Sequence, residues 1–142
     1  MKILLAVDGS KHALDAARCL VEHADWYREK PEVELVYVHL PVPKLPGMGK
    51  VVGRAQLKRY YEEEGAQALA RAKKLLEAAG IGYGAHVLVG SPAESIVDHA
   101  QAARCDLIYI GNRGMTAAGN LLLGSVASKV LHISTVPVLL VR

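Results

Sequence analysis

Residues 107–114 read Leu-Ile-Tyr-Ile-Gly-Asn-Arg-Gly, four residues suited to burial followed by two glycines around a polar pair. The first four show no alternation of polar and apolar positions. Such a continuous run is typical of a strand that is buried on both faces of a parallel sheet. The runs 3–7 and 136–141 have the same character, so we expect all three to be parallel strands.

Helical patterns separate these runs from one another and from two further runs, 33–38 and 85–89. The latter two carry Glu34 and His86 near their starts, which favours strands closer to a sheet edge. Regular alternation of strand and helix predicts a parallel sheet wound by right-handed crossovers. We therefore expect an α/β fold, with a doubly wound five-stranded parallel sheet of order 3-2-1-4-5 and helices on both faces, in a single domain over 1–142.

Local signals mark the ends of the helices. Ser10 is a suitable N-cap, and the apolar positions that follow at helical spacing are Ala13, Ala17, Leu20, Ala24 and Tyr27. A long helix is expected from about Arg54 to Ala79, ending at Gly80, although Gly65 inside it weakens this prediction.

Two more helix starts are visible further along the chain. The segment 91–94, Ser-Pro-Ala-Glu, predicts a capping box with proline in the first helical position. A last helix should begin near Gly124 and Ser125, and the side chains that we expect on its inner face are Val126, Val130 and Leu131. The segment 41–53, rich in proline and glycine, is expected to be a flexible loop and a possible lid.

Composition and charge exclude several classes of protein. The net charge of +3 arises from 17 basic and 14 acidic residues, a balance that argues against a nucleic-acid partner. The apolar run near the N-terminus is too short for a signal peptide or a membrane span. The two cysteines, Cys19 and Cys105, lack the spacing of a metal or disulfide motif, which favours reduced thiols and a cytoplasmic location.

Topology predicts where a ligand would bind. In open parallel sheets, ligands lie beyond the carboxyl ends of the strands, at the point where the strand order reverses. With the order 3-2-1-4-5, that point falls between the first and fourth strands. The residues that follow these two strands are 8–10, Asp-Gly-Ser, and 111–114, Gly-Asn-Arg-Gly.

The residues at this point suit a phosphate group. Gly111 permits a tight turn with positive φ, and Gly114 lets the backbone approach a ligand closely. Gly124 and Ser125 would present free amides and a hydroxyl at a helix N-terminus, where an anion is favoured. Arg113 would add a charge-assisted contact. The alternative is that these glycines only close turns and cap a helix.

Two common phosphate motifs are excluded. The segment 119–125, GNLLLGS, lacks the lysine of a P-loop and does not follow the first strand. The pair Gly82 and Gly84 is followed by Val87 where the dinucleotide fingerprint requires glycine, and it precedes a strand rather than a helix. Fast phosphoryl transfer and a nicotinamide role are therefore disfavoured.

The spacing Gly111-x2-Gly114-x9-Gly124-Ser125 resembles the ATP-binding motif of the universal stress protein family. The likeness covers the whole chain, because KILLAVDGS, VYVHL, VGSP, DLIYIGNRG and VPVLLVR all stand where that family has them. It implies an adenine nucleotide hydrolase-like fold and membership of the nucleotide-binding branch.

The resemblance also implies a role for individual residues in binding ATP. Val7 and Leu40 would contact adenine through the backbone, and Asp8 would lie near the ribose or near Mg²⁺ or Mn²⁺ held by the phosphates. The remaining residues implied for the ribose and phosphates are Gly111, Asn112, Arg113, Gly114, Gly124, Ser125 and Val126. Ala127 stands where many members have a hydroxyl, so one phosphate contact is missing unless Ser128 replaces it.

The six histidines show no metal-binding spacing, and most are expected at the surface or at helix ends. They are His12, His23, His39, His86, His99 and His132.

The family further implies a homodimer. The last strand, 136–141, is apolar and is expected at an edge of the sheet, where pairing with a second copy would cover it.

The resulting hypothesis is an ATP-binding, nucleotide-responsive regulatory protein of the stress response. The alternatives are a slow metal-dependent ATPase and a nucleotide-free dimerisation module. No catalytic residues are evident in the sequence, so we expect weak hydrolysis at most.

Overall fold

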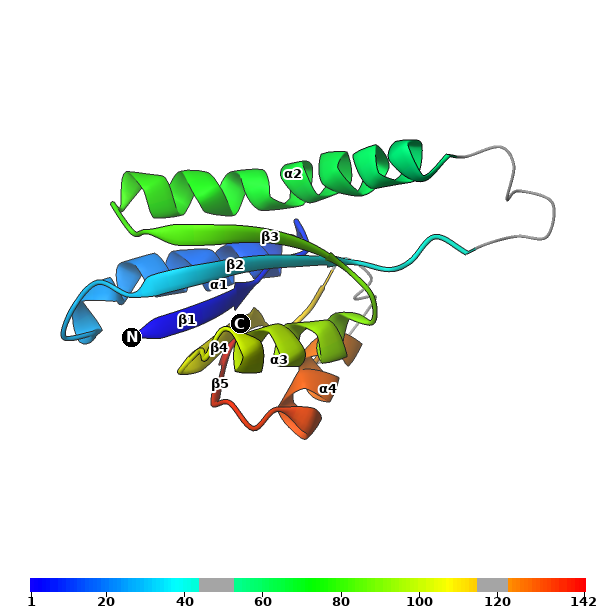
Figure 1. Ribbon diagram of the computed structural model, residues 1–142. Coiled ribbons are helices and arrows are strands. Elements are labelled where there is room, and N and C mark those ends of the chain that lie inside the picture. The colour runs from blue at the N-terminus through cyan, green and yellow to red at the C-terminus, as the bar shows by residue number, and fades with distance from the viewer. Residues whose placement is uncertain (44–52, 115–122) are drawn as a thin grey trace.

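The computed structural model describes residues 1–43, 53–114 and 123–142. Within these ranges, five strands form one parallel sheet of order β3-β2-β1-β4-β5. The strands are β1 (Lys2–Ala6), β2 (Glu32–His39), β3 (Tyr83–Val89), β4 (Leu107–Gly111) and β5 (Val138–Val141). The predicted strand order is confirmed, and β1 and β4 lie side by side at its centre (Figure 1).

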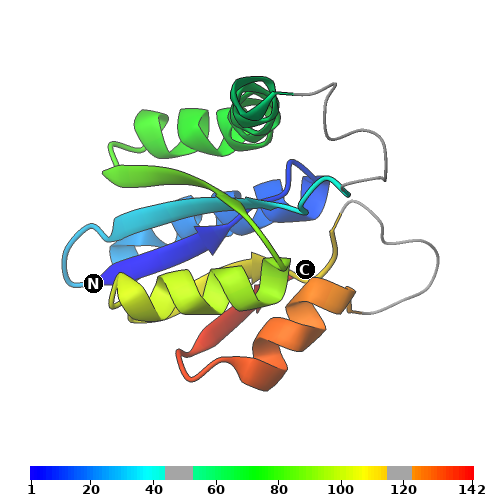
Figure 2. The same cartoon turned by 45° about the vertical axis from the view of Figure 1, so that its right-hand side comes forward.

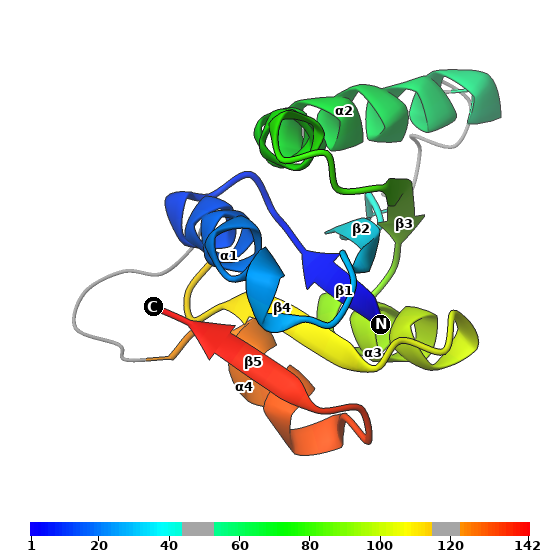
Figure 3. The same ribbon diagram turned by 90° about the vertical axis from the view of Figure 1, so that its left-hand side faces the viewer.

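Helices cover both faces of the sheet, as predicted. One face carries α1 (Lys11–Glu22), a short 3₁₀ turn (Ala24–Trp26) and α2 (Arg54–Ala78). The other carries α3 (Pro92–Ala102) and α4 (Ser125–Ile133), which lie next to each other (Figure 2). The view along the strands shows the three layers, with α1 and α2 on one side and α3 and α4 on the other (Figure 3). Among the described residues, no helix has both the length and the apolar character needed to cross a bilayer.

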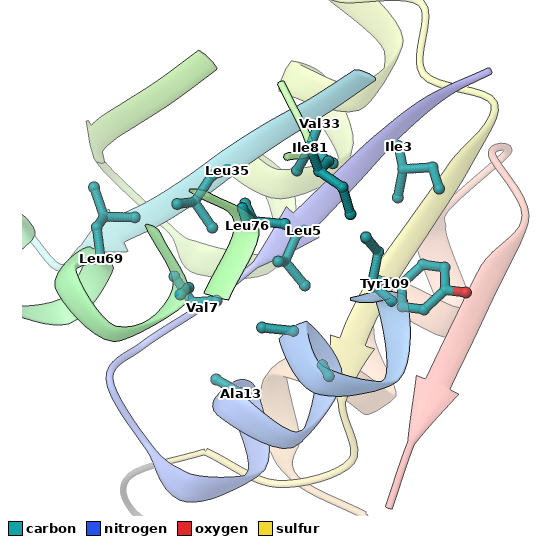
Figure 4. Packing of buried hydrophobic residues seen from close by; sticks show 14 residues of the cluster. Ile3, Leu5, Val7, Ala13, Val33, Leu35, Leu69, Leu76, Ile81 and Tyr109 are labelled. Atoms are coloured by element: carbon teal, nitrogen blue, oxygen red, sulfur yellow. The ribbon is translucent and has the colours of Figure 1, made fainter. Parts of the chain in front are cut away.

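The central strands are buried on both faces because successive side chains point to opposite sides. In β1, Ile3 and Leu5 pack toward α1 and α2, whereas Leu4 and Ala6 pack toward α3 and α4. Figure 4 shows the first of these two cores, which is built almost entirely from aliphatic side chains. Its one large aromatic member is Tyr109, whose hydroxyl lies 2.6 Å from the hydroxyl of Tyr27. Burial, together with this hydrogen bond, raises the pKa of Tyr109 above its ordinary range.

Several helix ends follow the sequence prediction. Ser10 is the N-cap of α1, and its Oγ accepts a 3.2 Å hydrogen bond from the amide of Ala13. Gly80 has a φ of 63° directly after α2, a conformation that favours glycine. The amide of Ile81 then donates to the carbonyl of Leu76, which closes the C-terminus of α2.

Other local predictions are wrong. Ser91 is the N-cap of α3 and Pro92 follows it, but the Ser91 side chain makes no capping hydrogen bond, and Glu94 forms an ion pair with Lys129 of α4 instead. Leu131 is 44% exposed, because Ala127 and Val130 occupy the inner face of α4. The first helix also ends earlier than its apolar spacing suggested, at Glu22.

Gly65 has a packing role that the sequence did not reveal. It is buried within α2, and a β-carbon at this position would overlap the methyl groups of Val87 on β3. Its lack of a side chain therefore lets the helix lie directly on the edge strand. This close approach explains a glycine in the interior of a long helix, where it costs about 1 kcal/mol relative to alanine.

We expect Gly65→Ala to lower the free energy of unfolding by about 1–2 kcal/mol, because the cost of overpacking exceeds the gain in helix propensity. Urea denaturation measures the change. In a Val87→Ala background the overlap is removed, so the same substitution should become neutral or stabilising. An equal loss in both backgrounds would contradict this packing explanation.

Candidate functional site

A cavity of about 440 Å³ opens at the carboxyl ends of the central strands, between the segments that follow β1 and β4. This is the place that the strand order predicted, and the volume lies in the range of small-molecule sites. All of the predicted site residues except Asn112 line it, namely Val7, Asp8, Leu40, Gly111, Arg113, Gly114, Gly124, Ser125 and Val126.

Asn112 is buried and holds the site together through its backbone. Its amide donates to the carbonyl of Val141 at 2.7 Å, and its carbonyl accepts from the amide of Gly124 at 2.7 Å. Asn112 therefore connects the end of β4 both to β5 and to the start of α4.

The turn after β1 is built by three consecutive residues. Asp8 Oδ1 accepts a 2.9 Å hydrogen bond from the amide of Ser10, and Gly9 between them has a φ of 81°. The positive φ that the sequence permitted at Gly111 therefore occurs at Gly9 and not at Gly111. Asp8 is thus a turn residue, and its carboxylate also lines the cavity.

Gly111 is required for packing rather than for a turn. It is the last residue of β4, and a β-carbon there would lie 2.6 Å from the carbonyl oxygen of His12 in α1. Because both groups belong to regular elements, the backbone has no easy way to move apart. Gly111 thus brings α1 close to β4 at the floor of the cavity.

Gly114 and Gly124 keep the backbone accessible beside Asp8 and Arg113. A β-carbon on Gly114 would lie 2.8 Å from Asp8 Oδ2, and one on Gly124 would lie 3.2 Å from the Cα of Arg113. These distances show that the segments after β1 and β4 and the start of α4 converge within one small volume.

The N-terminus of α4 faces this volume. Gly124 is its N-cap without a side-chain hydrogen bond, and no acidic residue lies in its first turn. The first-turn amides of Ser125, Val126 and Ala127 have no acceptor within the helix, and all three residues line the cavity. The positive end of the helix dipole therefore points at the cavity, and no carboxylate of the helix's own first turn offsets it.

Arg113 offers a second anion-binding group. Its Nε is buried, and no hydrogen-bond partner for this atom occurs in the described parts of the chain. An unpaired buried guanidinium nitrogen is costly, so an acceptor brought by a ligand would be favourable.

Some lining residues were not predicted. An apolar wall of the cavity comes from Val36, Val38, Ile96 and Ile110, and Pro92 at the start of α3 also contributes. Helix α3 adds Pro92 and Ile96 because it packs against β2. The segment VGSP before α3 was the sequence signal from which Pro92 could have been predicted as a cavity residue.

The whole chain, residues 1–142, matches the model of the universal stress protein family. The chain belongs to the universal stress protein family. A universal stress protein of Methanocaldococcus jannaschii is 34% identical over 141 residues, which cover 99% of this chain and 81% of that protein. A universal stress protein of Thermus aquaticus is 37% identical over 145 residues, covering 99% of this chain and 97% of that protein.

A solved family member has the same fold. The structure of the universal stress protein from Archaeoglobus fulgidus in complex with dAMP has a TM-score of 0.66 and is 27% identical, with 100% of this chain and 98% of that chain covered.

Most of the loop expected as a lid, residues 44–52 of the segment 41–53, lies outside the described residues of the present protein.

Because Gly111 meets backbone atoms, we expect Gly111→Ala to lower the free energy of unfolding by about 1–3 kcal/mol. Gly82→Ala is a matched control, since a β-carbon at Gly82 meets nothing within 4 Å. Urea denaturation of both variants measures the difference. Equal stability of the two variants would show that Gly111 is not needed for the contact with α1.

Proposed function

We propose that this universal stress protein binds ATP in the cavity between β1, β4 and α4 and acts as a nucleotide-responsive regulator. The observation that carries the proposal is the division of the cavity into an apolar wall and a wall of amides and a guanidinium. A nucleoside has an apolar, flat base, and its phosphates are anionic, so one ligand satisfies both walls. The dAMP complex of the family member from Archaeoglobus fulgidus supports an adenine nucleotide here.

Adenine would lie against the apolar wall and meet the backbone of Val7 and Leu40. The amide of Val7 already donates to the carbonyl of Val36 at 2.9 Å, so we assign its carbonyl to the exocyclic amino group. The carbonyl of Leu40 lies 2.5 Å from Nδ1 of His39, so we assign the amide of Leu40 to a ring nitrogen.

The phosphates would lie at the start of α4. Amides of Ser125, Val126 and Ala127 would donate to phosphate oxygens, as they do at other helix N-termini that bind anions. Ser125 adds a hydroxyl and Arg113 a charge-assisted contact. Ser128 is exposed and does not line the cavity, so a hydroxyl from Ser128 does not replace the one that Ala127 lacks.

Mg²⁺ or Mn²⁺ would enter with the phosphates. Asp8 is the only carboxylate among the described residues that line the cavity, and Mg²⁺ bound to a nucleotide needs few protein carboxylates. One Asp8 oxygen accepts a hydrogen bond from the amide of Ser10, and the other, Oδ2, lies beside Gly114. A carboxylate held in a turn is better suited to orienting a metal than to acting as a base, and this favours binding over hydrolysis.

A cytoplasmic location fits this function, because ATP is available there and the free thiols Cys19 and Cys105 suit a reducing compartment.

We expect one ATP to bind per chain in the presence of Mg²⁺, and Gly114→Val to weaken binding at least tenfold, about 1.4 kcal/mol, by displacing Asp8 and filling the cavity. Isothermal titration calorimetry measures both affinities. Gly82→Val is the control, since Gly82 is exposed and lies in open space.

Circular dichroism must first show that both variants are folded. Absence of ATP binding by the wild-type protein, or equal affinity of the two valine variants, would contradict the proposal. Release of ADP well above background would favour the ATPase instead.

We also propose that two chains pair through β5. This strand is an edge of the sheet, and its residues are only partly buried. The carbonyl of Pro137 accepts from the amide of Ile108 on β4, and the carbonyl of Val141 accepts from the amide of Asn112 just after β4. In a parallel ladder the backbone groups of Val138 and Leu140 therefore point outward. Such an unpaired apolar edge is a liability that a second copy would cover.

We expect a dimer in sedimentation equilibrium, and a monomer after Leu140→Pro, because proline removes an outward N–H without breaking the ladder to β4. Circular dichroism confirms that the variant is folded. A wild-type monomer, or a dimer that persists in a folded Leu140→Pro variant, would show that β5 is not the interface.

A further inference from the structure

A polar cluster lies on the face of the sheet that α3 covers. It consists of Glu34 on β2, His86 on β3 and His99 on α3, and the ligand atoms that these residues offer all lie within 4.8 Å of one another. Its members are 13%, 35% and 18% exposed in their side chains. They are far apart in sequence, so only the fold brings them together.

The sheet register explains this convergence. Glu34 pairs with Gly84 and Val36 pairs with His86, so Glu34 and His86 are near neighbours on adjacent strands. The side chains of Glu34 and His86 therefore lie on the same face of the sheet as that of Val36, which packs toward α3. His99 lies in the second half of α3 (Pro92–Ala102), the helix that covers this face, and its side chain reaches Glu34 and His86 from that helix.

The distances within the cluster suit a metal ion. Nε2 of His99 lies 3.1 Å from Oε2 of Glu34, and Nε2 of His86 lies 2.6 Å from the same oxygen. Ligand atoms around a tetrahedral zinc ion with bonds of 2.0–2.1 Å are separated by about 3.3 Å. The observed distances therefore need to open only by fractions of an ångström to admit an ion.

The orientation of His86 is a second, independent observation. Its Nε2 is buried, and within the described residues it has no hydrogen bond of good geometry, even though Glu34 is so close. The Nε2 atom of His86 therefore does not point straight at the carboxylate oxygen. Such an angle is expected when a histidine nitrogen and a carboxylate oxygen both bind one metal ion, because each then points at the ion and not at the other ligand. Gly84 leaves space beside it, because a β-carbon there would lie 3.1 Å from this nitrogen.

The second oxygen of Glu34 has its own partner. Nζ of Lys2 lies 3.3 Å from Oε1 and 4.0 Å from a carboxylate oxygen of Glu32. Lys2 thus orients the carboxylate and leaves Oε2 toward the imidazoles. Burial opposes ionisation of Glu34, but hydrogen bonds from His99 and Lys2 and the charge of His86 outweigh it and lower its pKa.

We propose that Glu34, His86 and His99 bind a divalent transition-metal ion of the zinc class. Two imidazoles and one carboxylate suit zinc and its neighbours rather than magnesium or calcium, which prefer oxygen ligands. In the described parts of the chain these three residues form the complete ligand group, so water takes the remaining position. The site is distinct from the nucleotide cavity, because none of Glu34, His86 and His99 lines that cavity. It is close to the cavity, however, since Ile96 at the cavity wall precedes His99 on α3 by three residues, about 4.5 Å along the helix.

The test is titration of the nucleotide-free protein with Zn²⁺ by calorimetry. We expect one equivalent to bind, and His86→Gln, His99→Gln and Glu34→Gln each to weaken binding at least tenfold, since even residues that only support metal ligands are worth about that much. His132→Gln is the matched control, because His132 is an exposed histidine on α4. Cys19→Ser is a second control, because Cys19 Sγ lies 3.6 Å from Nδ1 of His23 and could attract zinc.

The proposal would be overturned if a His86→Gln/His99→Gln double variant retained its affinity for Zn²⁺, or if Cys19→Ser lost it. Absence of Zn²⁺ binding by the wild-type protein would also overturn it. If the variants fail to fold, a measurement on the wild-type protein can still test the site. Crystals of the wild-type protein soaked in Zn²⁺ should show an anomalous scattering peak between the three side chains, and a peak elsewhere alone would refute the site. Because no nucleotide is added, the outcome does not depend on whether ATP binds.

Discussion

Burial of β1 and β4 on both faces is the constraint on which the other elements depend. Leu4, Leu5 and Ile108 are completely buried, so helices must cover each side of these strands. Parallel strands with helices on both faces have all their carboxyl ends at one edge. The turns after β1 and β4 therefore lie next to each other, and this adjacency creates the cavity.

Small residues let the backbone come close where the layers meet. At Gly65 a helix lies on an edge strand, and at Gly111 helix α1 lies against the end of β4. At Gly114 and Gly124 the same property serves the cavity, because amides near these residues are not shielded by side chains. The glycines of the motif thus have unequal roles, and the role that the structure shows for Gly111 is packing against α1.

The two proposed sites use the same sheet in different ways. The nucleotide cavity lies at the carboxyl end of the strands and depends on backbone amides and a helix dipole. The cluster of Glu34, His86 and His99 lies on the face below α3 and depends on side-chain atoms. A metal there would tie α3 to β2 and β3, and α3 also supplies Pro92 to the cavity wall.

Local signals, the apolar runs and the N-cap at Ser10, predicted the strands and the first helix start, and the alternation of strand and helix predicted the strand order. Glycine spacing pointed to the segments after β1 and β4, whereas Val7 and Leu40 followed only from the family resemblance, and the apolar residues of the cavity were not predicted. The sequence misjudged the inner face of α4 at Leu131, since packing partners decide which side of a helix is buried. The six histidines showed no metal spacing along the chain. Only the tertiary structure brought His86 and His99 to Glu34, because strand register and helix placement, rather than sequence distance, decide which side chains meet.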